Sequence, residues 1–299
     1  MHVSLEYYQP SGKFRPSILF YATVAATGGA LLAGLYELLL FYIPFIYLNF
    51  LIVLGFGAVL GVMSTWVLDR SHCRNRVVSF LLAFAIGATG LLASYTWNYR
   101  RFVSAVIEQH PEWSPLEVAL VGVPAFIEGR VEAGWQMKSS TMNGAFVWAI
   151  WGIEAAAVLG LAIFMVRDLT RTPYCEACRQ WTKKQAARLS GLDRTAAQPL
   201  LDRCDLPAVL ALAPREVEGD APMISLQRSY CPACSNTGYL TVSEVIFTRG
   251  SKNELQEHLH VLALNVVLTP KLSAQFVERF GDASGAGKEP APAAPPAAG

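Results

Sequence analysis

Charged residues are scarce in this chain, and one long stretch almost lacks them. They make up 16% of the 299 residues, whereas hydrophobic residues make up 53%. From residue 16 to residue 68 the only Asp, Glu, Lys or Arg is Glu37. A soluble core of this length would not tolerate so little charge. The composition therefore argues against an ordinary soluble globular protein and favours a membrane protein.

An excess of charge of one sign is missing as well. The net formal charge is +1, and residues 166–281 contain 14 Lys and Arg against 12 Asp and Glu. A nucleic-acid-binding domain normally shows a clear basic excess, so we expect no nucleic-acid partner. The chain also lacks a glycine-rich phosphate loop, a Ser-His-Asp arrangement and an exposed carboxylate pair. We therefore do not expect an enzyme.

Four apolar segments are long enough to cross a membrane, because a hydrocarbon core about 30 Å thick requires roughly 20 apolar helical residues. The predicted spans are Ile18–Phe41, Ile46–Leu68, Val77–Trp97 and Ala145–Val166. Small residues recur at helical spacing within the first three spans, as at Gly57 and Gly61. Such stripes let neighbouring helices approach closely in lipid, so they predict a packed four-helix transmembrane bundle.

The short loop between the second and third spans, residues 69–76, contains three arginines. Short arginine-rich loops remain on the cytoplasmic side, so the loop predicts a plasma (inner) membrane protein with both termini cytoplasmic and membrane lipid as its surroundings. The segment between the third and fourth spans then lies outside. Its Arg100 and Arg101 count against this orientation but are outweighed by the denser loop. Ser114 to Glu117 reads as a capping box with proline in the first turn, which predicts a short helix. The apolar run Val118–Ile127 is interrupted by Gly122 and Pro124 and is too short to span, so we expect it to lie on the membrane surface or on the bundle rather than to form a re-entrant loop.

Behind the spans, two Cys-x-x-Cys pairs dominate the sequence. They are Cys175 with Cys178, and Cys231 with Cys234. On the side assigned as cytoplasmic, thiols remain reduced, so structural disulfides are not expected and metal binding, redox chemistry or burial are left. One such pair presents two thiolates to an ion, and two pairs complete the tetrahedral set that zinc prefers.

The two pairs are near copies, since Tyr174 to Cys178 reads YCEAC and Tyr230 to Cys234 reads YCPAC. This duplication resembles the two knuckles of a zinc ribbon. The resemblance implies a small antiparallel sheet whose turns hold Zn²⁺ through the four cysteines, and it implies no particular activity. The knuckles are 52 residues apart, where a compact ribbon has about 15 to 20. We therefore expect an insertion between them.

The local patterns around the knuckles predict a mixed α+β domain. Alternating and β-branched segments favour strands, and a proline after a capping threonine favours a helix start. The expected strands are Gln180–Leu189, Ile224–Tyr230, Tyr239–Thr248 and Leu255–Leu268. The expected helices are Thr195–Ala213, broken at Pro199 and Pro207, and a last helix after the cap Thr269 that ends near Phe280.

Glu37 and Glu154 are the acids within the predicted spans, and an ionisable residue in a membrane span is a functional candidate by default. One hypothesis is that the two carboxyls line a proton or cation path. The alternative is that each is a protonated carboxyl that donates a hydrogen bond and so fixes the register of neighbouring helices. The sequence favours the second, because no Lys, Arg or His lies in the middle of a span.

The predicted fold class is membrane α-helical, a four-helix transmembrane bundle followed by a small α+β cytoplasmic zinc-ribbon-like domain. The expected parts are a cytoplasmic lead (1–15), helices one to three (16–97), an extracytoplasmic loop with a short helix (98–144), helix four (145–166), the zinc-ribbon-like domain (167–281) and a disordered Ala/Pro tail (282–299). A tail of this composition cannot bury a core.

These features favour a multi-pass membrane protein whose structural Zn²⁺ module binds an unknown protein partner on the cytoplasmic side, with an oligomer possible. A set of four thiolates closes the coordination shell, so no catalytic position is expected. Two alternatives remain open. One is a small transporter or channel component using Glu37 and Glu154, and the other is a membrane thiol-redox protein.

Overall fold

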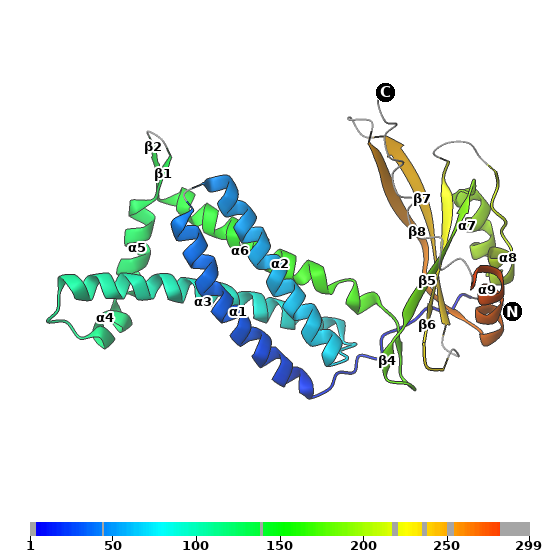
Figure 1. Ribbon diagram of the computed structural model, residues 1–299, viewed down its shortest axis with the longest axis horizontal. Helices are drawn as coiled ribbons and strands as arrows, with labels where there is room; N and C mark the ends of the chain where they lie inside the picture. The colour runs from blue at the N-terminus through cyan, green and yellow to red at the C-terminus, as the bar shows by residue number, and fades with distance from the viewer. Residues whose placement is uncertain are drawn as a thin grey trace, which may run out of the picture. The chain divides into compact units, whose positions relative to one another are not determined.

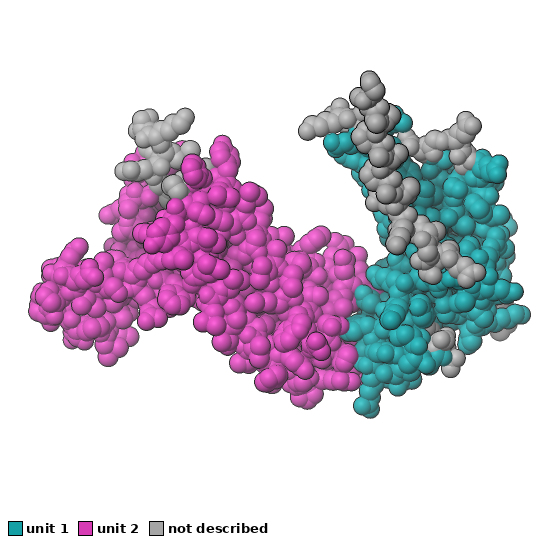
Figure 2. Space-filling view, in the orientation of Figure 1, with its two compact units in different colours: residues 1–10, 172–299 teal, residues 11–171 magenta. Residues whose placement is uncertain are grey.

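The computed structural model describes residues 4–43, 45–137, 140–216, 221–234, 238–249 and 254–281. The chain divides into two compact units (Figure 2). One, here the helical unit, consists of Ser11–Arg171, and the other, the sheet unit, combines Met1–Pro10 with Thr172–Gly299. The predicted tail, 282–299, lies outside the described residues.

Four long helices build the helical unit: α1 (Ser17–Tyr42), α2 (Ile46–Arg70), α3 (Arg76–Gln109) and α6 (Ala145–Val166) (Figure 1). All four are long and apolar enough to cross a membrane, and each contains one of the predicted spans. Helix α3 continues twelve residues beyond the expected end at Trp97, because neither glycine nor proline interrupts the chain before Pro111. Asn75 caps its start by accepting a hydrogen bond from the Val78 amide at 3.1 Å.

The long connection between α3 and α6 contains more regular structure than the sequence predicts. Helix α4 (Pro115–Val121) begins at the proline that was expected to open it, although Ser114 forms no side-chain cap. A second helix, α5 (Val123–Ala133), follows directly, because Pro124 lies in its first turn and therefore starts a helix where the sequence suggested a break. A hairpin of β1 (Trp135–Met137) and β2 (Ser140–Met142) leads to α6.

Helices α2 and α6 approach each other closely at two glycines of α2. A Cβ atom added at Gly57 would lie 2.9 Å from the Cα atom of Val158, and one added at Gly61 would lie 2.7 Å from the Met165 sulfur. Helices in lipid gain stability from such van der Waals contact rather than from the exclusion of water. The small-residue stripe predicted in the second span is therefore an interhelical contact.

A four-stranded antiparallel sheet, in the order β5-β6-β7-β8, forms the centre of the sheet unit. Its strands are β5 (Lys183–Ser190), β6 (Met223–Tyr230), β7 (Gly238–Arg249) and β8 (Leu255–Leu268). The segment predicted as one strand, Gln180–Leu189, is divided into β4 (Gln180–Trp181) and β5. Strand β4 pairs with β3 (Tyr174–Cys175) in a separate two-stranded sheet. The segment Leu255–Leu268 is a strand, as predicted.

Helices α7 (Arg194–Asp202), α8 (Leu206–Leu210) and α9 (Pro270–Phe280) lie together on one side of this sheet (Figure 1). Pro199 lies inside α7 and does not break it, contrary to expectation. The chain turns at Cys204, which has a positive φ of 59°. Pro207 is in the first turn of α8, and Thr269 caps α9 as predicted.

The strands and helices share one apolar core. Full burial of each large side chain contributes about 1.5–3 kcal/mol. The buried apolar side chains from the strands are Ala187, Leu189, Ile224, Leu226, Leu240, Val242, Ala263, Val266 and Leu268, and those from the helices are Ala197, Leu201, Leu206, Val209, Leu210, Phe276 and Phe280.

The N-terminal segment joins the outer edge of β8. Tyr7 bridges Val266 in antiparallel pairing. The amide of Val267 donates to the Glu6 carbonyl at 2.8 Å, and the Tyr8 amide donates to the Asn265 carbonyl at 2.9 Å. Residues 1–10 thus belong to the sheet unit, whereas the sequence suggested a separate lead over residues 1–15. The sequence alone cannot show this pairing, because the partners are more than 250 residues apart.

Candidate metal centre

The first knuckle is the turn between β3 and β4. Cys175 ends β3 opposite Gln180 in the two-stranded register, and Cys178 lies in the turn between them. Arg179 has a φ of 54°, which directs the chain back after Cys178. The Thr182 hydroxyl and amide both donate to the carbonyl of Pro173, at 2.9 and 3.1 Å, and close the base of the turn.

The second knuckle follows β6 directly. That strand ends at Tyr230, and Cys231 and Cys234 come next. Tyr230 pairs with Gly238, the first residue of β7, so the knuckle lies in the connection between two central strands.

The pairing of β5 with β6 brings the two knuckles together. Its antiparallel register sets Lys183 opposite Tyr230 and Ser190 opposite Met223. The first knuckle precedes the start of β5 and the second follows the end of β6, so both lie at the same end of the strand pair. Helices α7 and α8 occur in the connection at the other end. The insertion expected from the 52-residue spacing therefore leaves the knuckles adjacent.

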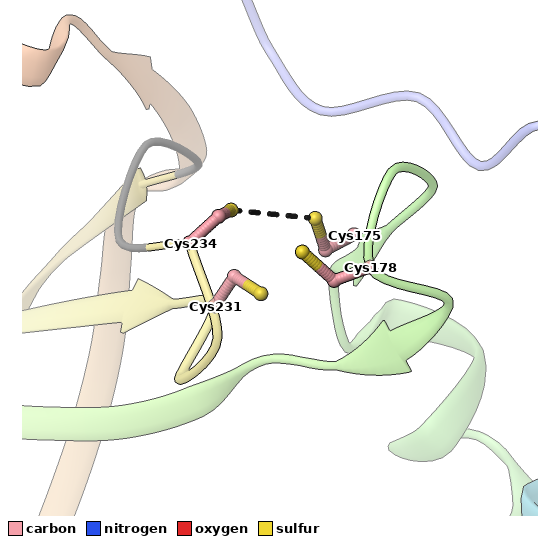
Figure 3. Close-up of side chains that lie close together, drawn as sticks. All are labelled: Cys175, Cys178, Cys231 and Cys234. Carbon is pink, nitrogen blue, oxygen red and sulfur yellow. Dashed lines mark hydrogen bonds between the residues drawn. The ribbon is translucent and has the colours of Figure 1, made fainter.

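All four cysteine sulfurs lie within 4.8 Å of one another. Figure 3 shows the side chains of the two knuckles pointing toward one another. The Cys175 and Cys234 sulfurs are 3.9 Å apart. Four sulfurs around one zinc ion at about 2.3 Å would be separated by about 3.8 Å. Cys175 and Cys231 are buried, whereas Cys178 and Cys234 are half-buried. Four cysteines in this arrangement can hold a metal ion, and their spacing fits a tetrahedral centre.

Cys231 and Cys178 differ in acidity. Burial raises the pKa of Cys231, but hydrogen bonds from the backbone at Cys234 and Ala233 and from the Gln180 side chain outweigh it and lower the pKa to about 6. The Gln180 amide nitrogen lies 3.2 Å from the Cys231 sulfur. Hydrogen bonds to Cys234 and Cys231 raise the pKa of Cys178 to about 12, because they stabilise its protonated form. No sequence motif indicates the role of Gln180, which lies beyond the Cys-x-x-Cys pair.

This set of ligands supports a structural metal centre more than a reactive one. Four thiolates leave a tetrahedral ion no position for water or substrate. A redox Cys-x-x-Cys pair usually lies at a helix start, where the dipole stabilises its thiolate. Here Cys175 ends strand β3 and Cys231 follows strand β6. Within the described residues, neither pair begins a helix.

The other two cysteines lie elsewhere. Cys73 is buried in the helical unit, where it contacts Asn75 and Ser79, and Cys204 lies in the turn between α7 and α8. Neither belongs to the cysteine cluster in the described part of the chain.

The two acids of the spans each contact a different helix. Glu37 of α1 is buried and accepts a hydrogen bond from the Asn98 amide of α3 at 3.0 Å. Glu154 of α6 accepts a hydrogen bond from the Tyr36 hydroxyl of α1 at 2.7 Å. The Tyr36 ring also stacks on Phe56 of α2, with 4.4 Å between centroids. These contacts connect all four long helices, and sequence reasoning missed the partners Tyr36 and Asn98.

Comparison of the chain with protein-family models, with curated proteins and with solved structures finds no match. The site and its chemistry must therefore be read from the geometry of this chain.

Proposed function

We propose that this chain is a multi-pass membrane protein whose sheet unit binds one structural Zn²⁺ and serves as a rigid docking module for a protein partner. The observation that supports it is the convergence of four cysteine sulfurs to within 4.8 Å in a chain that also has four helices able to span a membrane. The arginine-rich loop at 69–76 supports a cytoplasmic position for the sheet unit.

The projecting end of the β7–β8 hairpin is the proposed docking surface. The last pair between β6 and β7 is Met223 with Val245, so β7 continues from there paired only with β8. Large apolar side chains on this part of β8 are exposed, including Leu259 at 59% and Val261 at 44%. Among the described residues, the outer edge of β8 is bridged only at Val266. Exposed apolar residues on an unpaired strand edge favour strand-to-strand association with a partner.

The experiment combines metal analysis with cross-linking of the full-length protein in detergent and in native membranes. We expect one zinc per chain, thiols that resist alkylation until the metal is removed, and cross-links to a partner through the hairpin. The variant L259D/V261D should keep its zinc and lose the partner cross-link. Its matched control, Ala186→Asp on the exposed side of edge strand β5, should keep both.

Three outcomes would contradict the proposal. A chain that fractionates as a soluble protein would remove the membrane assignment. A protein that contains no bound metal would favour the redox alternative. So would cysteines that cycle between the dithiol and the disulfide state. Cross-links that survive L259D/V261D would place the docking surface elsewhere.

The contacts of the intramembrane acids support the structural role for Glu37 and Glu154 rather than an ion path. Each carboxyl has a hydrogen-bond partner on another helix, Asn98 and Tyr36 respectively, as is expected of a group that sets helix register.

A further inference from the structure

A cavity of about 680 Å³ opens between α1 and α3 on the helical unit. One wall is apolar and comes from α1, with Leu31, Leu35 and Leu38. The other comes from α3 and carries Trp97, Arg100 and Arg101. Leu31 is 70% exposed, so the cavity is open along the outer surface of the helix pair.

The Arg101 guanidinium lies near one end of α1, whereas the Arg100 guanidinium lies 5.5 Å from the centre of the Trp97 ring. The Arg101 guanidinium lies 4.8 Å from the centre of the Phe41 ring, and α1 ends at Tyr42. Trp97 lies deeper, since its indole nitrogen donates to the carbonyl of Ala30 at 3.4 Å. Along α1 the residues that line the cavity extend from Leu31 to Leu38, about 10 Å at the rise of an α-helix. One leaflet is about half of a hydrocarbon core roughly 30 Å thick, so the lining covers the part of a leaflet next to this end of the helix.

Within the described part of the chain, the two arginines at the groove contact aromatic rings rather than acidic side chains. Arg100 and Arg101 stack on aromatic rings, Trp97 and Phe41, and among the described residues neither forms a salt bridge with a carboxylate. Glu108 is the only acid that lines the cavity. It comes seven residues after Arg101 on α3 and is therefore about 10 Å farther along the helix.

We propose that this groove binds one phospholipid, with an acyl chain against the leucines of α1 and the phosphate held by Arg100 and Arg101. The leucines of α1 accommodate the part of an acyl chain next to the headgroup, and the two arginines that line the same cavity provide bidentate donors that suit a phosphate. An anionic headgroup is preferred over a neutral one because two arginines and one acid, Glu108, line the cavity, and neither arginine forms a salt bridge among the described residues. The inference rests on the membrane insertion proposed above and on no property of the metal centre.

The test uses the full-length protein purified in detergent, with binding measured by native mass spectrometry against three probes. These are phosphatidylglycerol, diacylglycerol with the same acyl chains, and glycerol phosphate. We expect phosphatidylglycerol to bind and the other two to bind at least about tenfold more weakly. The variant R100Q/R101Q should bind phosphatidylglycerol roughly 30-fold more weakly. Ala105→Trp, which fills the groove and keeps both arginines, should also reduce binding.

Two matched controls distinguish lipid binding in the groove from general effects of lost positive charge and of added side-chain volume. R70Q/R76Q removes two exposed arginines from the loop end of α2 and α3, and Leu92→Trp adds bulk to an exposed position of α3 outside the groove. Both should change binding by less than about twofold. Equal losses in R70Q/R76Q and R100Q/R101Q would overturn the proposal. So would diacylglycerol that binds as well as phosphatidylglycerol, or glycerol phosphate that binds as well as the lipid.

Membrane fractionation and zinc content, measured on the same preparations, keep this inference distinct from the proposed function. A membrane-embedded, zinc-loaded protein without lipid selectivity would contradict only the proposal that the groove binds a phospholipid. A protein absent from the membrane fraction would overturn the proposed membrane function together with it.

Discussion

In the sheet unit, strands and helices turn their large apolar side chains onto one shared core, whereas in the helical unit many large apolar side chains face outward. Leu19 of α1, for example, is 73% exposed. Outward apolar side chains on helices with satisfied backbones suit a lipid solvent, and an inward core suits water. The two units therefore depend on different interactions. The helical unit depends on close contact at small residues, and the sheet unit on apolar burial together with a cluster of four cysteines that could hold a metal ion.

The variant with the largest expected effect on this contrast removes one of the four clustered cysteines. Cys231→Ser should abolish stoichiometric zinc binding, because three thiolates leave the tetrahedron incomplete and the buried knuckle loses its cross-link. Hydrogen exchange should show that amides around both knuckles lose protection, at a cost of about 3 kcal/mol or more of local stability. Amides of α2 and α6 should be unaffected.

The matched control is Cys204→Ser, a cysteine of the same unit outside the cluster. It should keep zinc and amide protection. Stoichiometric zinc in Cys231→Ser would show that the four sulfurs are not the ligand set.

The second test breaks the helical unit and leaves the sheet unit intact. Gly57→Leu forces a side chain against the α6 backbone at Val158 and should destabilise the bundle by about 1–3 kcal/mol. Gly55→Leu is the control, since an added Cβ at that position meets nothing within 4 Å. Thermal melting in detergent, followed by helix circular dichroism, measures the difference.

If Gly55→Leu destabilised the bundle as much as Gly57→Leu, bulk alone would be responsible and the close contact between α2 and α6 would not matter. Zinc content should remain unchanged in both variants.

The smallest effect concerns the polar contacts inside the bundle. Tyr36→Phe removes the hydroxyl that donates to Glu154 and should cost about 0.6 kcal/mol, and at most about 1.7 kcal/mol. Glu154→Gln retains an acceptor oxygen for Tyr36 and should be nearly neutral in the same melting assay.

This pair of variants also separates the two roles considered for the acids. A register role requires the hydrogen bond, which Glu154→Gln preserves. An ion or proton path requires an ionisable carboxyl, so a measured flux that Glu154→Gln abolished without loss of stability would contradict the register role.

The predicted spans and strands depend on local sequence patterns, and these patterns were largely sufficient to locate the corresponding helices and strands. Helix α3 overran its expected end because span prediction stops where polarity rises, whereas a helix stops at a residue that breaks it. Pro124 and Pro199 were misread for a related reason. Whether a proline ends a helix depends on its position relative to the helix start, and that position is set by the neighbouring elements.

The sequence by itself determined the four apolar helices and the identity of the four clustered cysteines, because hydrophobic length and motif spacing act within short stretches of chain. Only the tertiary structure decided that the knuckles meet despite 52 intervening residues, since this depends on the register of β5 against β6. It also decided that the N-terminal segment pairs with β8 and that Tyr36 and Asn98 contact the buried acids. These contacts join residues far apart in sequence, and no local pattern records which distant partner is within reach.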